Sequence, residues 1–415
     1  MSGHQPLPLS PPRATRRQTL GLWILFAVFV AWPFALRLIW GIDLGFGDVH
    51  LYHFWAYQGV HEGSWPVLDF DWIYPIGALV PIAALSPLAG SSIYESLFIG
   101  LIYLVDAVIM MALRDRFGPR AAAWWLCFLL LLGPIAVSRL DSIAAALATV
   151  ALLVVATRPR LATTLILAAA WVKVAHATWM LPLLASSRRR IRDVIVPGLL
   201  STVLVVITAF LLGAETRLFS FAQGQSSRGL QNESVSAIPF QLSHMFGQTR
   251  LHGNLKLNVW EFNGPAARHL THVLDLAMPL TVLAVGALTL LAVRRNRMPR
   301  PELLLISLLA TTLSLLVLNK VGSPQYVVWL SSPAIASFAL GSSAHADWRR
   351  VRMLILIAAV STQIYYPIGY DALLDGKVWA GIALVIRNLT LIILFVSVCH
   401  TLWVAARRNP QPSRV

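Results

Sequence analysis

The sequence predicts an all-α polytopic membrane protein, and three observations support this fold class. Hydrophobic residues make up 57% of the 415 residues and charged residues only 12%, about half the charged share of an average globular domain. Apolar runs of about 20 residues, the length that crosses a bilayer as a helix, recur along the chain. Clusters of arginine separate many of these runs, as in the cytoplasmic loops of membrane proteins. The net charge of +15 therefore reflects topology, and we predict no nucleic-acid partner.

The chain begins with a tail, residues 1–18, whose Pro, Ser and Arg content predicts a disordered cytoplasmic segment. The first apolar run lacks a small-x-small cleavage site, so we expect it to remain as a helix. One membrane domain then covers residues 19–406, and residues 407–415 form a second cytoplasmic tail. Ten crossings are predicted: Leu20–Trp40, Ser92–Leu113, Ala121–Val137, Ser142–Thr157, Val194–Gly213, Thr271–Val293, Leu303–Asn319, Tyr326–Leu340, Met353–Ile368 and Gly381–Ala405.

Two further apolar segments do not fit simple crossings. Residues 73–89 carry three prolines, and counting them as a crossing would place the next arginine cluster outside. We therefore predict a dipping segment within a first external loop, residues 41–91. Residues 161–185 start and end near cytoplasmic arginines but are short for two crossings. They predict a hairpin of two half-helices with Lys173 and His176 at its turn, giving 10–12 transmembrane helices in all.

The distribution of charge supports this topology. Of the 33 Lys and Arg residues, 22 fall in the seven segments predicted to be cytoplasmic, with only four acids, while the other 11 are outnumbered by 14 acids. This asymmetry follows the positive-inside rule. We expect both termini in the cytoplasm and two large external loops, residues 41–91 and 214–270. Both cysteines lie in apolar runs, so no disulfide and no cysteine metal site is expected.

Asp48, in the stretch GDVHLY just after the first helix, is the first candidate for chemistry. A carboxylate held at a membrane face beside aromatic rings can accept a proton from a substrate hydroxyl. The alternative is a solvated loop aspartate, since surface charges mostly serve solubility. The other acids of the loop show no spacing that specifies a metal cage, and the chain carries neither GxGxxG nor GxxxxGK[ST]. We predict no metal and no cofactor.

Several cations lie at predicted external helix ends. Arg139 and Asp141 bracket the turn in SRLDS, where they either pin two helices together or bind substrate. Lys173 is costly at a hairpin turn unless it is paired or faces water, so it is a candidate for binding a phosphate. Lys320 in NKVGSPQYVVW is a second such candidate. Snorkelling of either lysine to the lipid headgroups is the alternative.

The second external loop is rich in amides and hydroxyls. Its stretch QGQSSRGLQNESVSAIPFQLSHMFG includes Arg228, Asn232, Glu233 and His244. Such side chains suit hydrogen bonding to a sugar or a lipid headgroup, and a solvated loop is the commoner explanation for each one alone.

The order of short motifs resembles the polytopic GT-C glycosyltransferases, and most closely glycosyltransferase family 87, the bacterial polyprenyl-phosphate-mannose-dependent α-mannosyltransferases. The resemblance runs from about Trp23 to the last helix. It is carried by GDVHLY after the first helix, YP at residues 74–75, RLD at residues 139–141, a lysine in a hairpin before Pro182, NES at residues 232–234 and SPQY at residues 323–326. The sequence departs from the pattern at Ile76, where the family often has a second proline, which affects the shape of the dip.

The resemblance implies a GT-C type bundle and an inverting sugar transfer. Asp48 occupies the position of the catalytic base, and Lys173, Arg139 and Lys320 match the cations near the phosphate of a polyprenyl-phosphate donor. A lipid-linked or glycan acceptor, membrane lipids as partners, a bacterial plasma-membrane location and an extracytoplasmic active site are implied too. Around these residues we expect substrate contacts from the following side chains: Tyr52, Tyr74, Asp141, His176, Asn232, His244 and Gln325.

Other classes of function remain open at this point. A polytopic transporter or lipid flippase is the main alternative, because broken hairpins with cations also mark transport paths. Transporters usually show repeated halves and short external loops, and this sequence shows neither. A lipid-to-glycan ligase or a non-catalytic scaffold is a third possibility.

Overall fold

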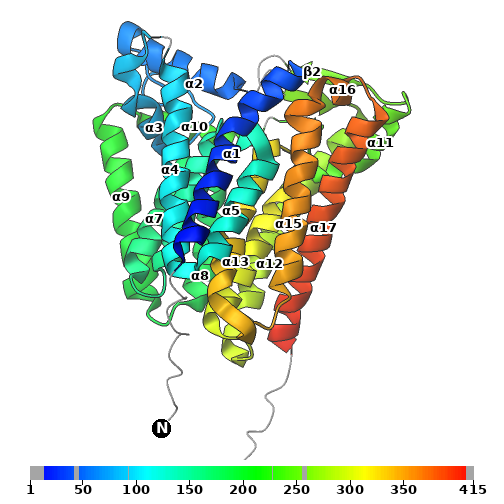
Figure 1. Ribbon diagram of the computed structural model, residues 1–415. Helices are drawn as coiled ribbons and strands as arrows, with labels where there is room; N and C mark the ends of the chain where they lie inside the picture. The colour runs from blue at the N-terminus through cyan, green and yellow to red at the C-terminus, as the bar shows by residue number, and fades with distance from the viewer. Residues whose placement is uncertain (1–13, 42–45, 92, 227, 255–258, 408–415) are drawn as a thin grey trace, which may run out of the picture.

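The computed structural model describes residues 14–41, 46–91, 93–226, 228–254 and 259–407, and the chain in these ranges is almost entirely helical (Figure 1). Eight helical segments within them are long and apolar enough to cross a membrane. They are α1 (Arg16–Trp40), α4 (Tyr94–Phe117), α5 (Pro119–Leu132) with η4 (Gly133–Ala136), η6 (Ile191–Ile195) with α9 (Val196–Leu211), α12 (Pro265–Arg295), α13 (Arg300–Val317), α15 (Trp348–Gln363) with η11 (Ile364–Ile368), and α17 (Val378–Arg407). The prediction of an all-α polytopic membrane protein is confirmed.

Local sequence signals determine where these helices begin and end. Thr15 and Gln18 form a capping box at the start of α1, and Gly41 ends that helix in the left-handed conformation. Proline occupies the first position of three helices, α5, α7 (Pro159–Val172) and α12. Proline is favoured there because its missing N–H would have no partner within the helix.

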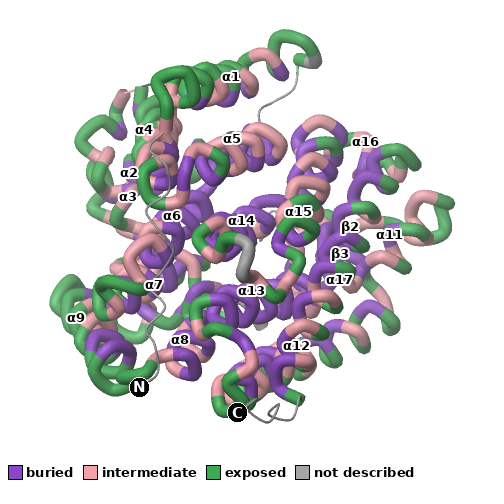
Figure 2. The backbone as a smooth tube through the Cα atoms, turned by 60° about the horizontal axis from the view of Figure 1, so that its bottom comes forward, coloured by how far each residue is buried: buried purple, intermediate pink, exposed green. Residues whose placement is uncertain are grey.

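The long helices differ sharply in burial. In α13, 89% of the most apolar window is buried, against 22% in α1, α9 and α12. Figure 2 shows α13 in the middle of the bundle, while α1, α9 and α12 lie on its rim and expose one side. The exposed side of α12 carries leucines such as Leu276 and Leu280. Apolar residues on the outside of a long helix are expected where lipid is the solvent.

The predicted hairpin of two half-helices is confirmed. α7 ends at Val172, Lys173 is its extended C-cap, and η5 (Val174–Trp179) leads into α8 (Met180–Ser186). Before the hairpin lies α6 (Leu140–Val154), which packs against α7. At 15 residues, α6 is shorter than the full crossing predicted for residues 142–157.

The predicted crossing over residues 326–340 is helical, but it is made of short pieces of mixed type and not of one α-helix. The segment consists of η9 (Pro324–Leu330), α14 (Ser331–Ala336) and η10 (Ser337–Ser343). Gly341 interrupts it with φ 61°, a conformation that glycine adopts without strain. Most of residues 326–338 are buried in protein, where irregular helix is tolerated at membrane depth.

The first loop contains more helix than the sequence predicted. Asp48 lies on α2 (Gly47–Tyr57), which continues into η1 (Gln58–Glu62). The predicted dip is a chain of short pieces, η2 (Ile76–Ala78), α3 (Leu79–Ala84) and η3 (Ser86–Leu88). In α2 the buried residues Val49, Tyr52 and Trp55 recur every three positions, so one face of the helix packs on the core.

The second loop contains a small sheet that was not predicted. Its antiparallel order is β1 (Leu230–Gln231), β3 (Val259–Phe262) and β2 (Leu251–Asn254), with Gln231 opposite Glu261. Short helices complete the loop: η7 (Glu215–Phe219), α10 (Ser220–Ser226), η8 (Val235–Ala237) and α11 (Ile238–Met245). The sheet, α2 and α16 (Tyr370–Leu374) all lie at one end of the bundle, here called the loop-rich end, opposite the start of α1 and the end of α17 (Figure 1).

Candidate active site

A cavity of about 720 Å³ opens at the loop-rich end. It is lined by α2, the start of the dip, the start of α6, the hairpin turn, the second loop and the segments around η9 and η11. Its volume is within the range of small-molecule sites, about 300–1,000 Å³. Polar and charged side chains share the lining with apolar ones such as Phe221, Met278 and Leu315.

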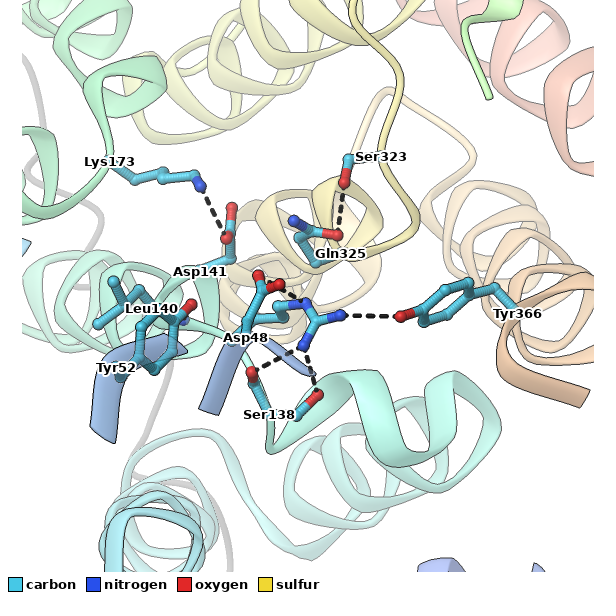
Figure 3. Close-up of polar contacts among 10 residues, drawn as sticks. Asp48, Tyr52, Ser138, Leu140, Asp141, Lys173, Ser323, Gln325 and Tyr366 are labelled. Carbon is cyan, nitrogen blue, oxygen red and sulfur yellow. Dashed lines mark hydrogen bonds and ion pairs between the residues drawn. The ribbon is translucent and has the colours of Figure 1, made fainter. Parts of the chain in front are cut away.

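Asp48 and Arg139 form an ion pair in this cavity. The Arg139 Nε lies 3.1 Å from Asp48 Oδ2, and the arginine side chain is 6% exposed while the aspartate side chain is 30% exposed. Arg139 also donates through Nη1 to the Ser138 carbonyl at 3.1 Å and through Nη2 to the Tyr366 hydroxyl at 2.9 Å (Figure 3). The planar guanidinium therefore fixes the position of the carboxylate from a buried side.

The position of Asp48 on α2 also favours its negative charge. Asp48 is the acid of the first helical turn, where backbone N–H groups and the helix dipole stabilise an anion. Leu51 and Tyr52 follow three and four residues later, on the same face of the helix. The Tyr52 hydroxyl accepts a hydrogen bond from the Leu140 N–H at 3.4 Å, so α2 is anchored to the start of α6.

Lys173 and Asp141 form a second pair where α7 ends and α6 begins. Lys173 Nζ lies 3.1 Å from Asp141 Oδ2, and the Asp141 side chain is only 1% exposed (Figure 3). The Trp329 indole N–H donates to Asp141 Oδ1 at 3.0 Å. The Lys173 ammonium also lies 4.4 Å from the centre of the Tyr74 ring, within range of a cation–π contact. The cation at the C-terminus of α7 and the acid at the N-terminus of the neighbouring helix α6 both match the helix dipoles.

Lys320 and Asp275 form the third ion pair of the cavity, at 2.9 Å. Lys320 lies in the connection after α13, which packs tightly against the turn at Asn232–Ser234 of the second loop. The Gln231 N–H donates to the Lys320 carbonyl at 3.0 Å. A Cβ atom added at Gly322 would overlap the backbone of Glu233 and Ser234, so only glycine fits there.

The structure brings six of the predicted site residues to the cavity lining: Asp48, Tyr74, Arg139, Lys173, Lys320 and Gln325. Two others support them from behind, Tyr52 through Leu140 and Asp141 through Lys173. The prediction of a shared site for residues far apart in the sequence is thus consistent with the geometry.

Three predicted substrate contacts do not line the cavity. The His176 ring is buried against Trp179 and Trp329, with ring centres 5.1 and 6.1 Å away. Asn232 is buried in its turn, and its N–H donates to the Trp260 carbonyl. His244 uses both ring nitrogens on the carbonyls of Thr249 and Leu374. The positions of these side chains indicate packing and turn formation, and not substrate contact.

Sequence reasoning missed the two tyrosines that follow α15. Tyr366 and Tyr370 line the cavity, and their rings pack edge to face with centres 4.9 Å apart. Tyr370 lies close to Glu233, and burial raises the pKa of the Glu233 carboxyl above its ordinary value. Only the glycine and proline around IYYPIGY marked this stretch in the sequence, as a helix end.

Arg228 lines the cavity too. Its Nε is buried without a hydrogen-bond partner in the described part of the chain. No described carboxylate lies within 4.0 Å of its guanidinium, whereas each of the other cavity cations has one. As for metals, the described ranges contain no group of three or more His, Cys, Asp or Glu residues placed to hold an ion.

The fold and the cavity define a class of protein: a multi-pass membrane protein with an acid, several cations and aromatic rings gathered in one site between its helices and loops. The sequence matches glycosyltransferase family 87 over residues 72–318, more than half of the chain. The protein belongs to this family and is a membrane glycosyltransferase. No curated protein and no solved structure matches the chain significantly.

The matched region contains Tyr74, Arg139, Asp141 and Lys173 and ends just before Lys320. Asp48 precedes it. Membership of a glycosyltransferase family favours sugar transfer over the transport function that the sequence left open.

Proposed function

We propose that the protein transfers a sugar, mannose by the resemblance of its sequence, from a polyprenyl-phosphate donor to a lipid-linked or glycan acceptor, with inversion at the anomeric carbon. The observation that carries the proposal is the cavity in which Asp48, bound to Arg139 at 3.1 Å, shares the lining with Lys173 and Lys320. A base for the acceptor and cations for a phosphate are the two requirements of this reaction.

Asp48 is the proposed general base. It accepts the proton of the acceptor hydroxyl as that oxygen attacks the anomeric carbon from the face opposite the phosphate. The new carbon–oxygen bond forms while the bond from the anomeric carbon to the phosphate oxygen breaks, and the electron pair leaves with the polyprenyl phosphate. The aspartate side chain is 30% exposed, so it is accessible from the cavity. Arg139 holds it in one orientation and balances its charge.

Lys173, Arg139 and Lys320, in that order, are the proposed contacts of the donor phosphate. An ammonium group has three donors, and Lys173 uses one of them on Asp141, so it can bind a phosphate without leaving its partner. Stabilising the charge that develops on a leaving group is usually the largest catalytic contribution. Apolar residues on the cavity wall, Met278 and Leu315 among them, suit the first isoprene units of the donor.

We also propose that the loop-rich end is extracytoplasmic and that both termini are cytoplasmic, in a bacterial plasma membrane. The connections at the opposite end carry arginine runs, including residues 188–192 and 294–300. Positive residues in short connections favour the cytoplasmic side. A donor with a polyprenyl chain would then reach the cavity from the outer leaflet.

The test uses membranes that contain the protein, a polyprenyl-phosphate-[14C]mannose donor and a range of glycoside acceptors. Asp48→Asn is expected to lower transfer by at least about 100-fold, the usual contribution of a positioned base. Asp71→Asn is the matched control, because Asp71 is an exposed acid of the same loop. Unchanged transfer by Asp48→Asn would remove Asp48 as the base. Absence of transfer by the unaltered protein from any polyprenyl-phosphate sugar would remove the proposed donor class.

A further inference from the structure

One wall of the cavity is made by three side chains that the proposed reaction has not used: Glu233, Trp260 and Tyr370, here called the Glu233 wall. Glu233 comes from the turn after β1, Trp260 from β3 and Tyr370 from the start of α16. These elements belong to the second loop and to α16, whereas Asp48 comes from α2. The cavity is therefore bounded by two separate polar surfaces.

A continuous row of side chains joins the two surfaces. Asp48 contacts Arg139 at 3.1 Å, and Arg139 donates to the Tyr366 hydroxyl at 2.9 Å. The Tyr366 ring packs on Tyr370, and the Tyr370 hydroxyl lies close to the Glu233 carboxyl. A molecule placed along this row would meet the proposed base at one end and the Glu233 carboxyl at the other.

The Glu233 carboxyl has hydrogen-bonding capacity to spare. The Tyr370 hydroxyl and the Glu233 backbone N–H are polar groups close to it. The ion pairs within 4.0 Å in the described part of the chain do not include it. A carboxylate offers about four acceptor positions, and a buried one is costly when they go unused. Because Glu233 is 7% exposed and lines the cavity, a ligand in the cavity can donate hydrogen bonds to the unused acceptor positions of its carboxylate.

The turn that carries Glu233 is held firmly in place. The Ser234 hydroxyl donates to the Asn319 carbonyl at 2.6 Å. Gln241 donates to the Ser234 carbonyl at 3.2 Å and accepts from Asn388 of α17 at 3.3 Å. Arg387, which is buried in the same helix, donates to Asn388 Oδ1 at 2.8 Å and to the Tyr365 hydroxyl at 2.6 Å. Such support is typical of residues that must hold one geometry for a ligand.

We infer that the Glu233 wall binds the sugar ring of the acceptor, so that the acceptor is a glycoside with two neighbouring free hydroxyls and not a simple lipid alcohol. The inference rests on the proposed function. A carboxylate can accept hydrogen bonds from two adjacent hydroxyls at once, and the Trp260 ring offers an apolar surface for the C–H face of a pyranose.

The charge of Glu233 separates the acceptor from the donor. The donor sugar is bonded directly to its phosphate, so a carboxylate that contacted this sugar would lie close to a second negative charge. Like charges at a few ångströms repel strongly in a partly buried site. The neutral, hydroxyl-rich partner in the reaction is the acceptor. Arg387 acts as a positioning residue, through Asn388 and the turn.

The experiment measures steady-state transfer from polyprenyl-phosphate mannose to hexyl glycosides and to their deoxy analogues, each lacking one hydroxyl. Glu233→Gln and Tyr370→Phe are expected to raise the KM for the glycoside by about 10- to 100-fold, the range of a lost charge-assisted hydrogen bond, with the donor KM unchanged. In the unaltered protein the two deoxy analogues that lack either of the neighbouring hydroxyls each show a similar rise in KM, and in Glu233→Gln both penalties largely disappear. Glu215→Gln, at an exposed acid of the same loop, is the control.

Each other outcome overturns the inference while leaving the proposed function standing. A raised donor KM with an unchanged acceptor KM would place the donor sugar at Glu233. Hexanol used as well as the glycosides would show that no acceptor sugar is recognised. A third such outcome is that the deoxy glycosides raise the KM by the same factor in the unaltered protein and in Glu233→Gln, while thermal unfolding shows that both proteins are folded. That result would remove Glu233 from acceptor binding. Failure of the unaltered protein to transfer from this donor counts against the proposed function instead.

Discussion

The pairing of Lys173 with Asp141 allows a substitution that separates a structural role from a catalytic one. Lys173→Met keeps most of the length of the side chain but removes its charge. Asp141, 1% exposed, then keeps the hydrogen bond from the Trp329 indole N–H at 3.0 Å but loses its cation. This single variant could lose activity because the donor phosphate loses a contact, or because a buried carboxylate without its cation destabilises the fold. The single variant therefore does not separate the two roles.

The size of the effect follows from the geometry. Two unit charges 3.1 Å apart attract each other by about 5 kcal/mol at an effective dielectric constant of about 20. Removing one partner of a buried pair usually costs about 3–5 kcal/mol, since the other charge stays buried. A protein whose stability is about 5–15 kcal/mol can be largely unfolded by such a loss. We therefore expect Lys173→Met to express poorly or to unfold at a much lower temperature.

The double variant Lys173→Met/Asp141→Asn removes both charges together. The asparagine side chain can still accept the Trp329 hydrogen bond, and replacing a buried ion pair by neutral groups is often nearly neutral for stability. Thermal unfolding in detergent and transfer from polyprenyl-phosphate mannose are measured on the same preparations. The double variant is expected to unfold close to the unaltered protein and to transfer about 100- to 1,000-fold more slowly, the usual effect of losing one transition-state charge contact.

A double variant that is both stable and fully active would refute the assignment of Lys173 to the donor phosphate. The pair would then serve only to join α6 to α7. A double variant as unstable as Lys173→Met would instead show that the charges themselves hold the hairpin in place, and donor binding would have to be measured directly, by retention of labelled donor on the purified protein.

Three further predictions concern the rest of the cavity. Arg139→Lys is expected to lower transfer by about 10- to 100-fold, because one ammonium cannot contact Asp48, Ser138 and Tyr366 together; a rate within a factor of two would contradict this geometry. Gly322→Ala is expected to lower the free energy of unfolding by about 1–3 kcal/mol and to impair transfer, since its Cβ would push the Glu233 turn away from Lys320. Gly100→Ala is the control, because a Cβ at Gly100 meets open space. Because burial raises the pKa of Glu233, its charge is lost at a higher pH than that of an ordinary glutamate. The acceptor KM is therefore expected to rise as the pH falls, and Glu233→Gln should flatten the profile.

Charge and topology were sufficient to predict much of the cavity. The positive-inside rule assigns four helix ends to the same face of the membrane, those that carry Asp48, Arg139, Lys173 and Lys320. The order of the crossings therefore predicted that these side chains lie near one another. The helix α2 was also within reach of the sequence, because Val49, Tyr52 and Trp55 share a spacing of three. It was overlooked because the loop was treated as a connection between crossings.

The Glu233 wall was not predictable in the same way. Its strands are two to four residues long, too short for an alternating pattern to identify. Tyr370 reaches Glu233 across more than 130 residues of sequence through a kink after α15, and no local signal encodes such a contact. His244 was chosen for its chemistry in a polar stretch, but both of its nitrogens serve backbone carbonyls.

Three cations of the cavity are already paired with acids before any substrate is present. Pairing lowers the net charge of the site, but it also fixes each ammonium or guanidinium in one position. A donor phosphate can then meet oriented N–H groups without rearranging them, and preorganised donors stabilise a developing charge without paying reorganisation energy during the reaction. On this reasoning the acids Asp141 and Asp275 matter for rate through the lysines that they hold. Replacing both partners of a pair tests this contribution more cleanly than replacing the lysine alone.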